Sequence, residues 1–370
     1  MRAWISGEPN GIRTEKPRGR ATRRALPLTP ARTLACLSAC LLGAPALAAP
    51  QVVTDIPPVH SLTAMVMGDL GEAVLLAGPG VSPHGFSLRP SQARSLEAAE
   101  LVISIGPDLA PWLDEAADAL APQALRLNLE DVPGTLALAF REGAAFEPHD
   151  HAHGDDHEDE HEDHDDHAHD EHDAHAHDDD HDDDHHDEHE GSEAHEHAHG
   201  AHDPHMWLDP QNALTWLGAI AAHLSQLDPE NAAAYAANAE AARAEIEAAA
   251  DQARALVAPI RGRPFVVFHD AYHYFEARFG VEAAAAVSMG DAARPGARRV
   301  AEVRARIEQL QARCIFAEPQ MPDSLLTAVA GDGVKIGQLD PLGADLDVGA
   351  QMYPALIVQL ARNLADCLGD

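Results

Sequence analysis

Histidine is the residue type with the most obvious chemistry in this sequence, and it occurs in two settings. Residues 149–202 contain 19 of the 25 histidines, together with 24 of the 61 acidic residues. In the second setting, His84, His205 and His269 stand singly beside glycine, proline or aspartate at the edges of apolar segments. Neutral imidazole nitrogens are preferred ligands of Zn²⁺, which usually takes four ligands. Both settings are therefore candidate metal sites.

The histidine-rich run, residues 149–202, has almost no apolar surface and contains no Lys or Arg. Such a chain cannot offset the roughly 1–2 kcal/mol per residue of backbone ordering entropy, so we expect it to be disordered when free. Its repeated His-x-His units should then bind metal weakly and exchangeably. Held close to a stronger site, they could still assist capture through a high local concentration. The alternative is a solvated spacer with adventitious affinity.

The three separate histidines lie where an open α/β sheet collects ligands, near the carboxyl ends of strands. His84 follows the apolar run 73–78 in a connection rich in Gly and Pro. His205 comes just before a predicted helix that begins at Pro210, and His269 ends the apolar run 264–269. Three imidazoles converging from separate segments would suit Zn²⁺. Each of them, taken alone, could instead be a capping or core residue.

The elements that must hold these histidines form two predicted α/β lobes. Short apolar runs alternate with helical segments after residue 51 and again after Pro264, which predicts mostly parallel sheets flanked by helices. Between them, residues 228–259 are rich in Ala, Glu and Arg and predict one long, rigid helix, capped by Asp228 and ended by Pro259. We predict an N-terminal lobe over 49–227, the linking helix over 228–259 and a C-terminal lobe over 260–370. The alternative for the helix is an ordinary surface helix within one domain.

The first 48 residues predict an exported protein. A cluster of arginines precedes the apolar run 33–50, which contains Ala46-Leu47-Ala48, the pattern of a signal-peptidase site, so we expect cleavage after about Ala48. A membrane anchor is the first alternative, but about 16 apolar residues with Gly and Pro near their end are short for a ~20-residue span. Lipidation at Cys40, within a Leu-Ser-Ala-Cys sequence, is the second.

Export and charge limit the partners and the cysteine chemistry. Only Cys314 and Cys367 would remain in the mature chain, and two thiols in an oxidising compartment suggest one disulfide, with two unpaired buried cysteines as the alternative. The formal net charge is −36, of which −24 belongs to the histidine-rich run and −12 to the rest. Because a polyanion repels phosphate, nucleic acid is not an expected partner.

Five segments of the sequence occur in an order that is shared with a known family. They are SPHGFSLRPSQ, DPHMWLDPQN, VVFHDAYHYFE, FAEPQ and LDPLG, with the acidic histidine run between the first two. Together they resemble the zinc-specific periplasmic solute-binding proteins of bacterial ABC transporters, over roughly residues 51–368. The resemblance implies a metal cleft between two α/β lobes joined by one long helix. It also implies that His84, His205 and His269 are the zinc ligands and that Cys314 pairs with Cys367.

The fourth metal ligand is left open by the same comparison of motifs. Some zinc-binding members carry a carboxylate before the first histidine, where this chain has Pro83. Asp340, in LDPLG, follows an apolar strand at a position from which several relatives supply a carboxylate; otherwise it caps the following turn. His60 or water are the other candidates. We expect Glu318 to shape the site without binding the metal.

His223 and His273 are the remaining histidines outside the run. His223 lies in the middle of a predicted helix, where we expect a structural role. His273 follows His269 by four residues and would share its face on a helix. Relatives of the family usually have a small residue at that position, so the sequence gives His273 no defined role.

The resemblance implies a periplasmic receptor that captures Zn²⁺ and delivers it to an ABC-transporter permease with its ATPase, without turnover. A periplasmic zinc chaperone is a further candidate partner. The alternatives are a zinc buffer or chaperone that works without a permease, and a manganese or nickel receptor of the same fold. A zinc hydrolase would also use three histidines and a water, but no motif places a general base beside these three.

Overall fold

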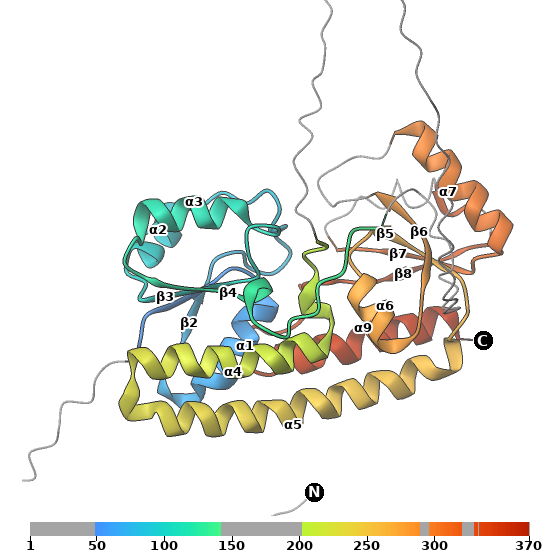
Figure 1. Cartoon of the computed structure of the whole chain (residues 1–370). Helices are drawn as coiled ribbons and strands as arrows, with labels where there is room; N and C mark the ends of the chain where they lie inside the picture. Colours follow the sequence, from blue (N-terminus) through green and yellow to red (C-terminus); the bar gives the residue numbers. More distant parts are fainter. Residues whose placement is uncertain (1–48, 142–201, 289–295, 320–328, 332, 370) are drawn as a thin grey trace, which may run out of the picture. The chain divides into compact units, whose positions relative to one another are not determined.

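The structure is a computed structural model that describes residues 49–141, 202–288, 296–319, 329–331 and 333–369 (Figure 1). All of these described residues belong to one compact unit. The predicted signal peptide, residues 1–48, lies outside the described residues, as does the histidine-rich run up to residue 201. Among the described residues, no helix combines the length and the apolar character that a membrane crossing needs.

The N-terminal lobe contains a sheet of four parallel strands in the order β2-β1-β3-β4. The strands are β1 (Val52–Thr54), β2 (Ala73–Leu75), β3 (Leu101–Ser104) and β4 (Leu125–Asn128). Helices α2 (Pro90–Glu97) and α3 (Pro111–Leu120) cover one face, and α1 (Pro57–Met67) and α4 (Pro210–Leu227) cover the other (Figure 1). All four helices carry Pro at their first turn, where the missing N–H costs no hydrogen bond.

The C-terminal lobe repeats this topology with a second parallel sheet, in the order β6-β5-β7-β8. Its strands are β5 (Phe265–His269), β6 (Ala283–Ser288), β7 (Cys314–Ala317) and β8 (Lys335–Gln338). The helices are α6 (His273–Phe279), α7 (Ala297–Leu310) and α9 (Met352–Leu368). The prediction of two α/β lobes with parallel sheets is therefore confirmed. The sequence pattern of residues 323–331 also predicts a helix, but most of these residues lie outside the described ones.

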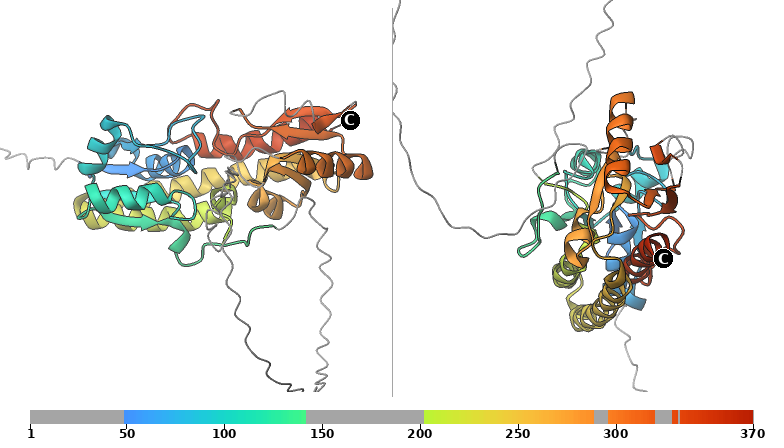
Figure 2. Two further views of the ribbon diagram at one scale, coloured as in Figure 1. Left: turned by 90° about the horizontal axis from the view of Figure 1, so that it is seen from above. Right: turned by 90° about the vertical axis from the view of Figure 1, so that its right-hand side faces the viewer.

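The long helix between the lobes is α5 (Ala232–Val257), whose 26 residues span about 39 Å. Its buried stripe consists mostly of alanine, which allows α4 and α9 to pack closely against it. Figure 2 shows the two lobes side by side along the length of α5. The helix ends in a short 3₁₀ turn at Ala258–Ile260 that contains Pro259, as predicted.

The start of this helix differs from the prediction. A 3₁₀ turn, Pro229–Asn231, precedes α5, and Asp228 makes no side-chain cap with the backbone. Its carboxylate accepts hydrogen bonds from the Asn231 amide at 2.7 Å and from the Tyr235 hydroxyl at 2.9 Å. Because two nearby side chains compete for the carboxylate, Asp228 fastens the first turns together through side chains instead of capping the backbone N–H groups.

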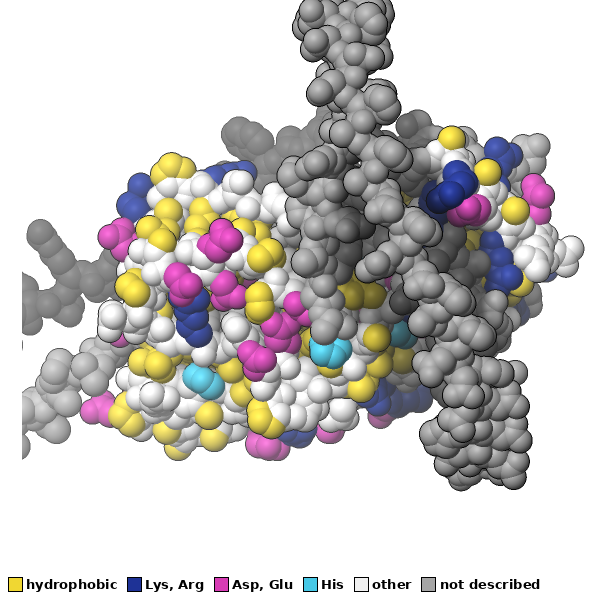
Figure 3. Space-filling view, turned by 45° about the horizontal axis from the view of Figure 1, so that its top comes forward, with side chains coloured by type: hydrophobic (Ala, Val, Ile, Leu, Met, Phe, Trp, Pro, Cys, Tyr) yellow, Lys and Arg dark blue, Asp and Glu magenta, His cyan; other side chains and the backbone are white. Residues whose placement is uncertain are grey.

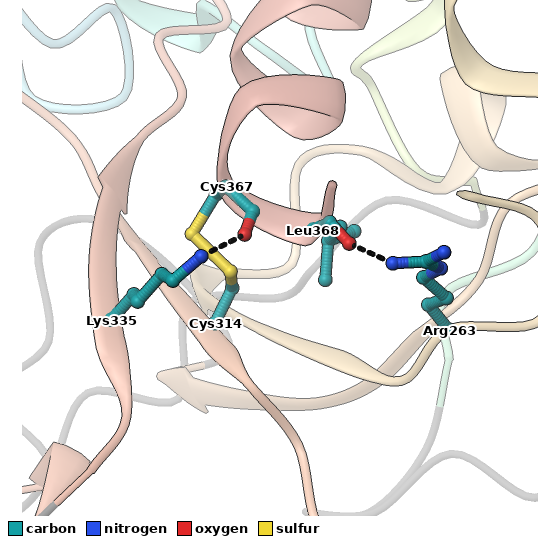
Figure 4. Close-up of a disulfide and its surroundings, with 5 residues drawn as sticks. All are labelled: Arg263, Cys314, Lys335, Cys367 and Leu368. Atoms are coloured by element: carbon teal, nitrogen blue, oxygen red, sulfur yellow. Dashed lines mark hydrogen bonds between the residues drawn. A yellow bond between two sulfur atoms is a disulfide. The ribbon is translucent and has the colours of Figure 1, made fainter. Parts of the chain in front are cut away.

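A disulfide joins Cys314 at the start of β7 to Cys367 near the end of α9, the pairing that the resemblance implied (Figure 4). Basic side chains also contact this end of α9. Lys335 Nζ donates to the Cys367 carbonyl at 3.4 Å, and Arg263 donates to the Leu368 carbonyl at 2.6 Å. These contacts satisfy carbonyls that have no partner within the helix, so the last turn is held to the sheet on both sides.

Candidate metal centre

His84, His205 and His269 meet at one point between the lobes. One ring nitrogen from each lies within 4.8 Å of those from the other two. The Nε2 atoms of His205 and His269 are 3.2 Å apart. Two nitrogens bound to one tetrahedral zinc at 2.0–2.1 Å would be about 3.3 Å apart, so this pair already has the spacing of zinc ligands.

His269 is the last residue of β5, and its ring is oriented by a carboxylate from the neighbouring strand. Nδ1 of His269 lies 2.6 Å from Oε1 of Glu318, which follows β7 directly. Both residues are 2% exposed. An ionised carboxylate can only accept, so the ring hydrogen belongs on Nδ1 and Nε2 presents its lone pair to the site. The expectation that Glu318 supports the site is consistent with this contact.

His205 precedes the short 3₁₀ turn Met206–Leu208 and has a carboxylate partner of the same kind. Oδ1 of Asp203 lies 2.7 Å from His205 Nδ1 and also accepts the His205 backbone N–H at 3.0 Å. Burial raises the pKa of Asp203 to about 6, although the backbone hydrogen bond from His205 opposes this rise. Above that pH the carboxylate is ionised and directs His205 Nε2 toward His269.

Asp203 is a residue of the site for which the sequence analysis assigned no role. The sequence did contain a signal for this role, because an aspartate two residues before a histidine can bond to both the backbone and the ring of that histidine. On the face shown in Figure 3, histidine forms only small patches, in keeping with the burial of His205 and His269.

His84 reaches the group from the connection between β2 and α2 in the N-terminal lobe. Trp112 of α3 holds this connection by donating from Nε1 to the Pro83 carbonyl at 2.7 Å. The Phe86 ring packs on the same indole, with 4.8 Å between ring centroids. The His84 ring is half-buried and its centroid lies 5.6 Å from that of His205 and 6.4 Å from that of His269.

The space between the three rings is small. Pro83, Trp207, Glu318, Pro341 and Leu342 line it together with the histidines. Its volume is about 10 Å³, close to that of one water-sized sphere. The space therefore has the size of a single ion.

The other two candidate ligands, Asp340 and His60, make hydrogen bonds away from the three histidines. Both oxygens of Asp340 accept backbone N–H groups of the following turn, from Leu342 and Ala344, and Asp340 is not part of the group of three histidines. His60 Nε2 lies 3.1 Å from the Ala73 carbonyl. His273 begins α6, with Nδ1 4.0 Å from Asp203 Oδ2.

His223 lies inside α4, where its Nδ1 contacts the carbonyl of Ala219 at 2.8 Å. This is a contact with the preceding turn of its own helix, in line with the structural role expected from the sequence.

Comparisons with known proteins identify the family of the chain. The family model of ZnuA, the zinc-uptake complex component A, periplasmic, matches residues 52–367. The high-affinity zinc uptake system protein ZnuA of Paracoccus denitrificans is 48% identical over 338 residues, which cover 90% of this chain and 97% of the relative. The protein of the same name from Brucella abortus is 44% identical over 318 residues, 86% of this chain and 91% of the relative.

A solved structure supports the fold. The periplasmic zinc binding protein TroA from Treponema pallidum matches with a TM-score of 0.64 at 20% identity, over 87% of this chain and 100% of TroA. The parallel sheets and the long helix are thus those of a known architecture. With the family model covering residues 52–367, the chain belongs to the ZnuA family of periplasmic zinc-uptake components.

Proposed function

We propose that this protein captures Zn²⁺ between its two lobes and delivers it to the permease of an ABC transporter that an ATPase drives. The observation that carries the proposal is the convergence of three imidazoles from separate segments, two of them backed by carboxylates. The names of its relatives, which are zinc uptake proteins, support the same cargo. Export of the chain and removal of residues 1–48 belong to this proposal.

In this proposal His84, His205 and His269 are the protein ligands of the zinc. Neutral nitrogen donors favour Zn²⁺ over Mn²⁺, which prefers carboxylate oxygens. The fourth position is taken by water or by Asp340, whose oxygens already accept two backbone hydrogen bonds and would need to turn toward the metal. Binding proceeds without turnover, as befits a receptor that must release its cargo unchanged.

Residues 149–202 act as an auxiliary zinc-acquiring segment in this scheme. They supply many imidazoles beside carboxylates, and they are attached next to the segment that carries His205. Several weak and exchangeable sites near the cleft would raise the local zinc concentration without competing with tight binding. A periplasmic zinc chaperone could supply the metal to either site.

Calorimetric metal titration of the mature protein tests the proposal. Deletion of residues 149–202 should leave one tightly bound zinc while removing additional weak equivalents. Replacement of His84, His205 or His269 by Ala should weaken the tight site, whereas His223→Ala, which changes a histidine held inside α4, should not. Loss of all zinc binding on deletion of the run would contradict the proposal, and tighter binding of Mn²⁺ or Ni²⁺ than of Zn²⁺ would change the cargo.

A further inference from the structure

Helix α6 begins four residues after His269 and contacts both chain segments that border residues 142–201. The hydroxyl of Tyr274 is the first contact. It accepts a hydrogen bond from the Leu138 backbone N–H at 2.8 Å and donates one to the Asp203 carbonyl at 2.8 Å. Tyr274 is fully buried, so its hydroxyl joins these two segments inside the protein. One of them leads, two residues later, to His205.

Two ion pairs extend the attachment of α6. The guanidinium of Arg141 is bound by Glu276 of α6, with the shorter contact at 2.6 Å, and by Asp270, which follows His269. These three side chains are 4–8% exposed. Farther along the helix, Arg278 makes two contacts of 2.6 Å with Asp209, the residue that caps α4. The buried charges around Arg141 require close geometry, and the two-contact pair of Arg278 with the buried Asp209 is directional even though Arg278 is partly exposed, so the three attachments fix the orientation of α6 relative to both segments.

The segment 203–209 is also held by the C-terminal lobe on its other side. Trp207 Nε1 donates to the Pro341 carbonyl at 2.7 Å, and the Tyr353 hydroxyl of α9 donates to the Trp207 carbonyl at 2.8 Å. His205 precedes α4 in the sequence. The residues two positions before and after it, Asp203 and Trp207, are nevertheless hydrogen-bonded to the C-terminal lobe. The connection that carries His84 is bonded instead to Trp112 in the N-terminal lobe.

We propose that α6 is the positioning element of the metal centre and that Tyr274 is its principal positioning residue. It fixes the peptide of His205 to the lobe that carries His269, so that these two histidines form a preset pair. His84 is the ligand that completes the site from the other lobe. This inference rests on the proposed function, because it assigns unequal roles to the three zinc ligands.

The variant Tyr274→Phe tests the inference, since it removes one hydroxyl and leaves the ring in place. We expect the dissociation constant for zinc to rise by about 10- to 100-fold, the usual effect of removing a group that orients a ligand. The rise should come from faster zinc release. The visible absorption of the Co²⁺-substituted protein should also change, because the spacing of the two Nε2 atoms alters the coordination geometry.

Tyr235→Phe is the matched control. Tyr235 is equally buried, and its hydroxyl donates to Asp228 at the start of α5, where it contacts no ligand-bearing segment. It should lower the melting temperature while leaving zinc affinity and the Co²⁺ spectrum unchanged. A Tyr274→Phe protein with the zinc affinity and spectrum of the wild type would overturn the inference, as would an equal effect of Tyr235→Phe.

A second pair of variants covers the case in which Tyr274→Phe does not fold. Arg278→Gln breaks the partly exposed end of the α6 attachment, and Arg126→Gln removes an arginine of comparable exposure that pairs with exposed Asp118 within the N-terminal lobe. Only Arg278→Gln should weaken zinc binding; equal affinities would overturn the inference. If the wild-type protein has no tight zinc site, the proposed function itself is wrong. If the wild-type protein binds zinc tightly and the α6 variants bind it equally well, only this inference is wrong.

Discussion

At the residue scale, the centre pairs each of two buried imidazoles with one buried carboxylate. Asp203 and Glu318 place two carboxylates beside a space of about the size of one ion. Because an uncompensated charge is costly away from water, the two carboxylates favour a dication between the rings. Burial is the largest cause of the raised pKa of Asp203, about 6, and it reflects the cost of placing this charge away from water.

The variant Glu318→Gln should lower zinc affinity by about 10- to 100-fold, because a neutral amide makes the His269 ring a weaker electron donor and orients it less firmly. Competition with a chromogenic chelator measures the change. Glu240→Gln is the control, since Glu240 lies exposed on α5 in a long contact with Arg243. Equal affinities of the two variants would show that the contact between Glu318 and His269 has no bearing on binding.

At the element scale, the N-terminal sheet depends on a buried carboxylate at the end of β1. Asp55 is 0% exposed and accepts the backbone N–H of Ile56 at 2.7 Å and of Ile105, just after β3, at 2.8 Å. It thereby ties the ends of two neighbouring strands together. Burial is the largest influence on Asp55 and raises its pKa from 3.8 to about 7 against the opposing hydrogen bonds.

This shift predicts that Asp55 makes the protein less stable as pH rises. Between pH 4 and pH 7 the unfolded chain loses the Asp55 proton while the folded chain keeps it, so the free energy of unfolding falls, by at most about 4 kcal/mol. Asp55→Asn, which cannot ionise, should lack this part of the decline. Urea denaturation of the zinc-free proteins at pH 5 and pH 7.5 measures it, and parallel pH profiles for wild type and variant would contradict the raised pKa.

The elements were predictable from sequence where burial alone determines them. Strands such as β3 and β5 are fully buried, so their apolar runs stand out, and Pro210 marks the start of α4. The first turn of α5 was not predictable, because tertiary packing decides whether the Asp228 carboxylate bonds to backbone N–H groups or to side chains.

The site was predictable only in part. The three histidines stand out at the ends of apolar runs, but only the motif resemblance joins them into one ligand set, because their spacing in the chain gives no sign of contact. The bonds of Arg141 to Asp270 and Glu276 join residues 129 and 135 positions apart, a distance over which periodicity carries no information.

At the scale of the whole molecule, the disulfide joins helix α9 to the second sheet at the amino ends of its strands. Cys314 pairs in register with Phe265 at the start of β5, whereas His269 ends that strand. The disulfide and the histidine cluster therefore lie at opposite ends of the strands. We expect changes at one end to alter the stability of the lobe and changes at the other to alter the geometry of the site.

Replacement of both Cys314 and Cys367 by Ala should lower the free energy of unfolding by about 2–4 kcal/mol, because the bond closes a loop of 53 residues in the unfolded chain. Zinc affinity should stay within a few-fold of the wild type. Urea denaturation and zinc titration of the same preparations check both statements. A large loss of zinc affinity would mean that the two ends of the strands are energetically coupled.

The pairing of Leu138 with Asp203 has one further consequence. The backbone N–H of Asp203 donates to the Leu138 carbonyl at 2.8 Å, so two residues that are far apart in the sequence are joined directly. Once two points of a chain are joined, doubling the length of a flexible connection between them costs only about 0.6 kcal/mol of closure entropy. Insertions or deletions between Leu138 and Asp203 should therefore have little effect on the free energy of unfolding.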